Sequence, residues 1–188
     1  MVEIFVNLRS FLLTTKSMAN LSEMPTLALP PAKLRFETGL DGHTRVFDTL
    51  RRRFVTLTPE EWVRQHFTAF MIGYRGYPAG LMANEVALRL NTTLRRCDTV
   101  VFERLGGTPL MIVEYKAPSV AITQKVFDQI ARYNLVLKTR WLVVSNGLNH
   151  YCCNIDPTTG RYAFVDGMPA YADIARTRHL QNTSSLKK

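Results

Sequence analysis

The sequence has 188 residues, of which 46% are hydrophobic and 21% are charged. This is the composition of a soluble globular protein, with enough chain for one domain that has its own hydrophobic core. The 24 Lys and Arg residues outnumber the 15 Asp and Glu residues, which gives a net charge of +9. Such a charge favours a polyanionic partner, nucleic acid first and an anionic membrane second. A surface that is basic only for solubility explains the charge equally well.

The cysteines and histidines indicate neither a disulfide framework nor a zinc site. Cys97, Cys152 and Cys153 are odd in number and lack metal-binding spacing. Cys152 and Cys153 are adjacent, so in a strand their side chains point to opposite faces. The absence of a disulfide pattern fits a reducing cytosol, and we expect a cytoplasmic protein.

The first 26 residues are expected to form a poorly ordered N-terminal extension. Glu3 and Arg9 interrupt its apolar run, so it reads neither as a signal peptide nor as a membrane span. We therefore expect no membrane partner. The translation start is left open between Met1, Met18 and Met24.

Two local patterns follow. Residues 33–48 predict a hairpin with Asp41 and Gly42 in its turn. Thr58 is a predicted helix N-cap, and Glu61 completes a capping box with it. The helix then has an apolar face made of Val63, Phe67, Phe70 and Met71.

The next elements alternate between strands and a helix. Strands are predicted at 84–90, 97–102, 109–116, 141–147, 150–156 and 162–167, and a helix at 122–138. The order is helix, three strands, helix, two strands, with 162–167 as an additional edge strand. It predicts an α/β domain over residues 27–173, with a mixed central sheet flanked by helices, and a polar tail at 174–188.

Charged residues interrupt two of these apolar strands. Glu114 and Lys116 are two residues apart and share one face of a strand, and Asp98 on the preceding strand can point to the same face. Two carboxylates so placed can hold Mg²⁺, which polarises a phosphate and activates a bound water, while the lysine stabilises developing charge. The alternative is a solvated Glu–Lys pair, which the bare D-x₁₅-E-x-K pattern favours by itself.

Further residues favour a site over solvated charges. Glu85 lies on the strand before Asp98 and can add a third carboxylate. Gln129 and Tyr133 are four residues apart and reach one face of the following helix. The cations near these positions that could meet phosphates are Arg95, Arg96, Arg132, Lys138 and Arg140.

These residues match the D…ExK…QxxxY pattern of the PD-(D/E)XK nucleases. The strings "LTPEEWVRQHF", "MIVEYKAP", "ITQKVFDQIARYN" and "VSNGLNHYCC" are more specific. They resemble the N-terminal nuclease domain of type I restriction enzyme R subunits, in its short stand-alone bacterial version. The resemblance covers roughly residues 30–173 and implies a restriction endonuclease-like core. Cys97 stands where the superfamily name has proline, and the sequence has no G-x-x-x-x-G-K-[ST] loop for an ATP-driven motor.

The resemblance implies roles for individual residues. Glu85, Asp98 and Glu114 would be acidic or metal-binding, the Tyr115 carbonyl would be a further metal ligand, and Lys116 would be catalytic. Gln129 and Tyr133 would support the site or contact DNA, beside Arg95, Arg96 and Arg132. The expected function is Mg²⁺- or Mn²⁺-dependent hydrolysis of DNA; the alternative is a non-catalytic nucleic-acid-binding or assembly module with a vestigial site. A homodimer, separate restriction-system subunits and the choice between DNA and RNA are left open.

Overall fold

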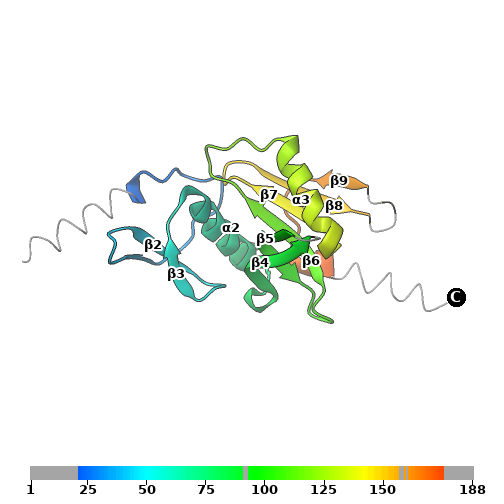
Figure 1. Cartoon of the computed structure of the whole chain (residues 1–188), viewed down its shortest axis with the longest axis horizontal. Helices are drawn as coiled ribbons and strands as arrows, with labels where there is room; N and C mark the ends of the chain where they lie inside the picture. Colours follow the sequence, from blue (N-terminus) through cyan, green and yellow to red (C-terminus); the bar gives the residue numbers. More distant parts are fainter. Residues whose placement is uncertain (1–20, 91–92, 157–158, 160, 176–188) are drawn as a thin grey trace, which may run out of the picture.

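The computed structural model describes residues 21–90, 93–156, 159 and 161–175 (Figure 1). The strands are β1 (Phe36–Thr38), β2 (Thr44–Asp48), β3 (Arg53–Thr56), β4 (Met82–Leu90), β5 (Thr93–Phe102), β6 (Pro109–Tyr115), β7 (Trp141–Ser145), β8 (His150–Ile155) and β9 (Tyr162–Val165). The helices are α2 (Pro59–Arg75), the short 3₁₀ helix η1 (Ala79–Leu81) and α3 (Gln124–Leu137). The predicted α/β order is confirmed, including the edge strand β9.

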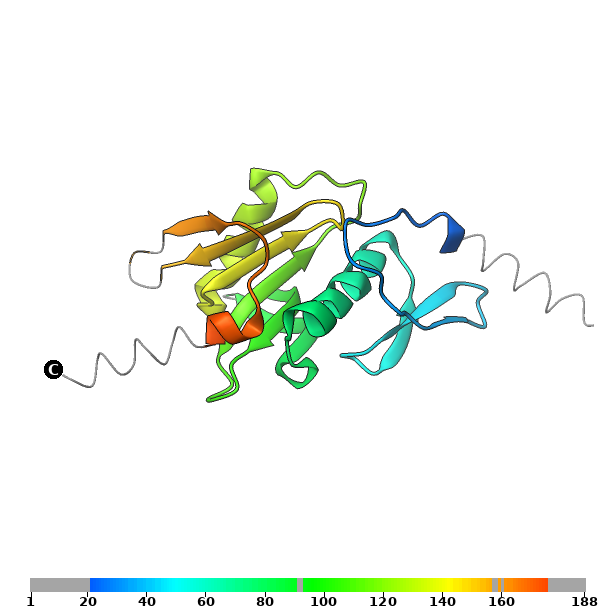
Figure 2. The ribbon, with the colours of Figure 1, turned by 180° about the vertical axis from the view of Figure 1, so that it is seen from behind.

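The strands form a three-stranded sheet, β1-β2-β3, and a six-stranded sheet in the order β4-β5-β6-β7-β8-β9. Neighbours in the larger sheet are antiparallel except β6 and β7, which run parallel. A parallel pair needs a crossover, and α3 provides it. Figure 1 shows α3 over one face of this sheet, and Figure 2 shows α2 over the other. The smaller sheet lies beside α2 and away from β9 in both views.

The alternation of side chains along β6 divides the core into two parts. On the α2 side, Met111, Val113 and Tyr115 pack with the apolar face of α2. On the α3 side, Ile112 packs with Val126, Ile130, Leu142 and Val144. The adjacent cysteines follow the same rule, since Cys152 belongs to the first cluster and Cys153 to the second. All three cysteines are free and buried.

Helix α2 begins as predicted but uses its acidic residue differently. The Thr58 hydroxyl accepts a hydrogen bond from the Glu61 N–H (3.0 Å), and Pro59 occupies the first turn. The reciprocal half of the predicted capping box is replaced, because the Glu61 carboxylate accepts bonds from Arg51, Arg64 and Gln65. The helix ends at Gly76, whose φ of 68° is the left-handed cap conformation.

Both ends of the described chain contact the domain. The Pro25 carbonyl accepts a bond from the Trp62 indole (3.0 Å), and Ala28 donates to the carbonyl of Gly147 (2.8 Å). Ile174, one residue beyond the predicted boundary, is 2% exposed. Most of the predicted extension at 1–26 and tail at 174–188 lies outside the described residues, so these boundaries stay predictions. In the described part, no helix combines the length and apolarity that a membrane span requires.

Candidate active site

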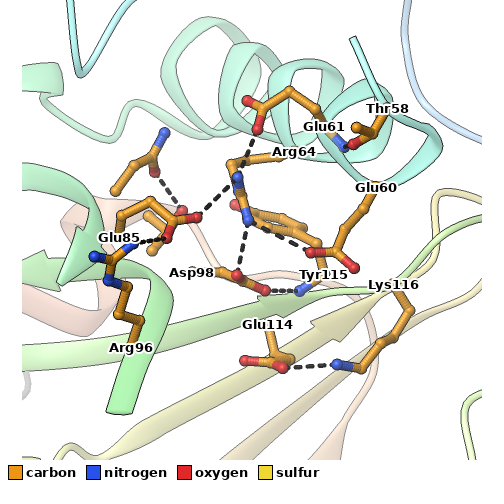
Figure 3. Close-up of polar contacts among 12 residues, drawn as sticks. Thr58, Glu60, Glu61, Arg64, Glu85, Arg96, Asp98, Glu114, Tyr115 and Lys116 are labelled. Atoms are coloured by element: carbon orange, nitrogen blue, oxygen red, sulfur yellow. Dashed lines mark hydrogen bonds and ion pairs between the residues drawn. The ribbon is translucent and has the colours of Figure 1, made fainter. Parts of the chain in front are cut away.

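A buried carboxylate lies at the end of β6, where this strand leaves the sheet (Figure 3). Glu114 is only 4% exposed, and its Oε1 accepts bonds from the Lys116 ammonium (2.8 Å) and the Gln129 amide (3.0 Å). Gln129 comes from α3, so the crossover helix is joined directly to the charged pair. Three of the predicted site residues are therefore in contact.

Asp98 fixes β5 to the same end of β6. Thr99 of β5 pairs with Val113 of β6. Beyond this pair, the carboxylate of Asp98 takes over the contact with β6. Its Oδ2 accepts from the backbone N–H of Tyr115 (2.8 Å), and its Oδ1 accepts from the Arg64 guanidinium (2.7 Å). Asp98 thus lies between strand β6 and helix α2.

The third predicted carboxylate, Glu85, is turned toward α2. It interrupts the regular pairing of β4 with β5, between Asn84 and Val86, and its φ is 58°. A left-handed residue other than glycine is uncommon within a strand, and such strain concentrates at functional sites. The Glu85 carboxylate lies 3.1 Å from Arg64 and 3.8 Å from Arg96. Glu85 therefore joins the site through Arg64.

Arg64 is a central residue that the sequence analysis missed. It is 4% exposed, and its guanidinium lies 2.6 Å from Glu61, 2.7 Å from Asp98 and 3.1 Å from Glu85. Burial lowers the pKa of Arg64, but the charges of these carboxylates outweigh it, so the pKa is raised and the group stays cationic. The sequence did contain a pattern that could have indicated Arg64. Polar residues recur at helical spacing beside the apolar face of α2, as Glu61, Arg64, Gln65 and Thr68, and all four are buried.

Glu60 is a second missed residue, at the first turn of α2. Its carboxylate lies 3.6 Å from Arg64, on the side that faces Lys116 in Figure 3. Burial raises the pKa of Glu60, and the charge of Asp98 raises it further. In the sequence, an acidic residue at a helix start is explained by the helix dipole alone, so nothing marks Glu60 as part of a site.

The environment of Glu114 favours its neutral form. Burial raises the pKa of Glu114 to about 7, and the charge of Asp98 contributes in the same direction. Burial also opposes the charge of Lys116, but its hydrogen bond to Glu114 outweighs this, so the pKa of Lys116 is raised. The Cys97 thiol is affected too, because burial and then the charge of Glu114 raise its pKa to about 12. The cations of the site thus compensate its negative charge only in part.

A row of alternating charges connects this site to the smaller sheet. Arg51 bonds to Asp48 at the end of β2 and, at 2.7 Å, to Glu61. The Asn84 amide donates to Asp48 (2.8 Å) and accepts from the Thr99 hydroxyl (2.6 Å). The smaller sheet is therefore attached to the site by buried polar contacts.

The other predicted residues have separate positions. Arg96 is largely exposed (68% of its side chain) and lies 3.8 Å from Glu85. Arg95 lies on β5, and Arg132 and Tyr133 lie on α3, but their side chains are outside the described part of the structure.

Divalent cations such as Mg²⁺ are bound by oxygen ligands that lie close together. Among the described residues, no three His, Cys, Asp or Glu side chains are grouped so that they could share an ion. Asp98 and Glu114 nevertheless offer the hard oxygen ligands that Mg²⁺ prefers. The charge of Asp98 raises the pKa of Glu114, and a bound cation would relieve this repulsion. The remaining lone pairs of Asp98 and Glu114 could hold such an ion, with Arg64 in contact with Asp98 (2.7 Å) as well as with Glu85 (3.1 Å).

Comparison with known proteins identifies the family. The model of the type I restriction enzyme R protein N terminus matches residues 59–169, which is more than half of the chain. The chain belongs to this family. Its mixed six-stranded sheet with flanking helices is consistent with the restriction endonuclease-like core that the resemblance implied.

Solved structures and curated proteins provide two further comparisons. A solved structure that resembles the chain is the fragment structure of a putative HsdR subunit of a type I restriction enzyme from Vibrio vulnificus YJ016. It is 17% identical with a TM-score of 0.47, over 66% of this chain and 26% of that chain. No curated protein matches.

Proposed function

We propose that this chain is a metal-dependent nuclease that hydrolyses DNA phosphodiester bonds. The observation that carries the proposal is the contact at the end of β6 between the buried carboxylate of Glu114 and the partly buried ammonium of Lys116, 2.8 Å apart. Asp98 reaches the same strand end through the Tyr115 N–H. A buried charged set that is hydrogen-bonded from two strands and two helices is difficult to explain as solvated surface charge.

Each residue would have a distinct task. Asp98 and Glu114 would hold Mg²⁺ or Mn²⁺, with the Tyr115 carbonyl as a further ligand. The ion, when bound, would polarise the phosphate and lower the pKa of a water. Lys116 would stabilise the negative charge that develops on the phosphate. Gln129 would hold the Glu114 carboxylate in position through its 3.0 Å bond.

A second candidate is a nucleic-acid-binding or assembly module without catalysis. It is favoured by Arg64, which already neutralises Glu85 and one oxygen of Asp98. Where Arg64 compensates the charge of these carboxylates, less negative charge is left for a metal to neutralise. The net charge of +9 would still attract DNA. This candidate predicts salt-sensitive binding without cleavage.

The two candidates are separated by cleavage of supercoiled plasmid and of single-stranded DNA with Mg²⁺ or Mn²⁺. The nuclease predicts nicking that stops with EDTA and is lost in Lys116→Ala. Lys125→Ala, an exposed lysine at the start of α3, is the matched control and should retain full activity. Nicking that survives in Lys116→Ala would refute the assignment, and binding without nicking would support the second candidate.

The family relation also suggests partners. We propose that DNA and other subunits of a restriction system bind this chain, and that the protein acts in the cytoplasm. Co-purification with such subunits, compared between wild type and a variant that still folds, would test the partner proposal.

A further inference from the structure

The outer edge of the larger sheet carries an exposed aromatic cluster, defined here as Phe127, Tyr151, Tyr162 and Phe164. Tyr162 is 55% exposed and Phe164 is 56% exposed, on the terminal strand β9. They are opposite Ile155 and Cys153, and Cys153 belongs to the core on the α3 side, so both rings lie on that face. The rings contact one another edge to face, with Phe127 of α3 at 5.4 Å from Phe164 and 5.9 Å from Tyr151.

Among the residues that the structure describes, no strand pairs with the outer side of β9. The Asp156 N–H donates to the Arg161 carbonyl (2.8 Å), whereas the Ile155 N–H points the other way, to Arg140. Hydrogen-bonded and non-hydrogen-bonded pairs alternate along antiparallel strands. The N–H and C=O groups of Tyr162 and Phe164 therefore point away from β8. The four residues of β9 include no charge and no proline, the usual protections of an open edge.

We propose that β9 pairs with β9 of a second copy of this chain and joins the two sheets into one. The two-fold axis of such an antiparallel pair is perpendicular to the sheet, so each side chain keeps its face. Residues opposite one another must share a face, which selects pairings such as Ala163 with Ala163. In this register Tyr162 lies opposite Phe164 twice, and their outward backbone groups form the hydrogen-bonded pairs.

Charge agrees with this register. Arg161 and Asp166 flank β9 and are both exposed. In this register Arg161 of one copy lies opposite the uncharged Val165 of the other, so like charges are not directly opposed there. Single-stranded nucleic acid is the rival occupant, because bases stack on exposed aromatic rings. The exposed acids Asp128 and Asp156 near the cluster disfavour a polyanion there.

The size of the surface sets the expected strength. An aromatic side chain presents about 150–250 Å², so the three exposed rings, Tyr151, Tyr162 and Phe164, would bury roughly 300 Å² in all. Stable interfaces bury about 1,200–2,000 Å², and the remainder must come from backbone and flanking residues. We expect a weak dimer. Each copy carries a net charge of +9, so added salt should strengthen association by screening repulsion, whereas it weakens nucleic-acid binding.

Sedimentation velocity from about 1 to about 500 μM, at low and high salt, tests the pairing over the concentrations where weak dimers form. The wild type should dimerise with rising concentration, more at high salt. Phe164→Lys should raise the dissociation constant about tenfold or more, since the change counts twice in a symmetric interface. Tyr74→Lys, on a ring that is 59% exposed but lies on α2, is the matched control and should dimerise like wild type. Circular dichroism verifies that both variants fold.

Cross-linking tests the register without disrupting the edge. Residues directly opposite in a non-hydrogen-bonded pair have Cα atoms about 4.5 Å apart, within disulfide reach. Ala163→Cys should form a covalent dimer under mild oxidation, above a low background because the native cysteines are buried. The inference is independent of the proposed nuclease activity. A protein that stays monomeric at every concentration would overturn the proposed dimer. So would a dimer that persists in Phe164→Lys and lacks the cross-link at residue 163. A monomer whose aromatic cluster instead binds single-stranded DNA would overturn it as well.

Discussion

Replacement of Arg64 by methionine should destabilise the protein more than any ordinary surface change. The guanidinium is 4% exposed and lies within 3.1 Å of Glu61, Asp98 and Glu85. Methionine fills similar volume but leaves these carboxylates without their cation. Removal of one partner from a buried ion pair costs about 3–5 kcal/mol, so we expect a loss of that size in the free energy of unfolding.

The matched control is Arg45→Met. Arg45 pairs with Asp41 at 3.3 Å, but both side chains are more than a third exposed. Pairs of this kind contribute about 0–1 kcal/mol. Urea unfolding at pH 7.5, followed by tryptophan fluorescence, gives both free energies. A loss no larger than that of Arg45→Met would refute the role of Arg64 as the internal cation.

Two other predictions concern stability. The pKa of Glu114 is about 7 in the folded state and 4.5 in the unfolded state, so the folded state binds more protons between these pH values. Its stability therefore falls by about 3 kcal/mol as the pH rises through this range. Glu114→Gln should gain stability relative to wild type from pH 4.5 to 8, and a difference in melting temperature that stays the same at every pH would contradict this. Gly147→Ala should lose about 1–2 kcal/mol, because φ is +83° and the new Cβ would lie 2.6 Å from Leu27, whereas Gly73→Ala in α2 should gain about 0.5–1 kcal/mol. Equal urea midpoints for the two alanine variants would contradict the backbone reasoning.

Elements with a strong local signal could be predicted from the sequence. The hairpin turn at Asp41 and Gly42 is observed, with Gly42 at a φ of 76°. Thr58 caps α2 as its hydroxyl chemistry indicated. The apolar alternation around Glu114 and Lys116 placed both residues on one face, and the structure brings them to 2.8 Å. Periodicity is a property of consecutive residues, so a single sequence is enough to detect it.

Features that depend on tertiary contacts could not be predicted in the same way. Glu85 was expected beside Asp98 and Glu114; it shares the Arg64 guanidinium with Asp98, and its left-handed backbone was not foreseen. No local pattern indicates such a conformation for a glutamate, because the surrounding fold stabilises it. Glu61 likewise fitted a capping box, and only the structure shows that its carboxylate contacts Arg51 (2.7 Å) and Arg64 (2.6 Å).

The measurement that tests the central proposal most directly is nicking of supercoiled plasmid with Mn²⁺ by wild type and Glu114→Gln at equal concentration. Glutamine preserves the shape of the side chain and can still contact Lys116, but it removes the charge that would hold the ion. A metal-dependent nuclease predicts nicked circles from the wild type only, abolished by EDTA. Equal nicking by both proteins, or nicking unaffected by EDTA, would contradict a metal site at Asp98 and Glu114.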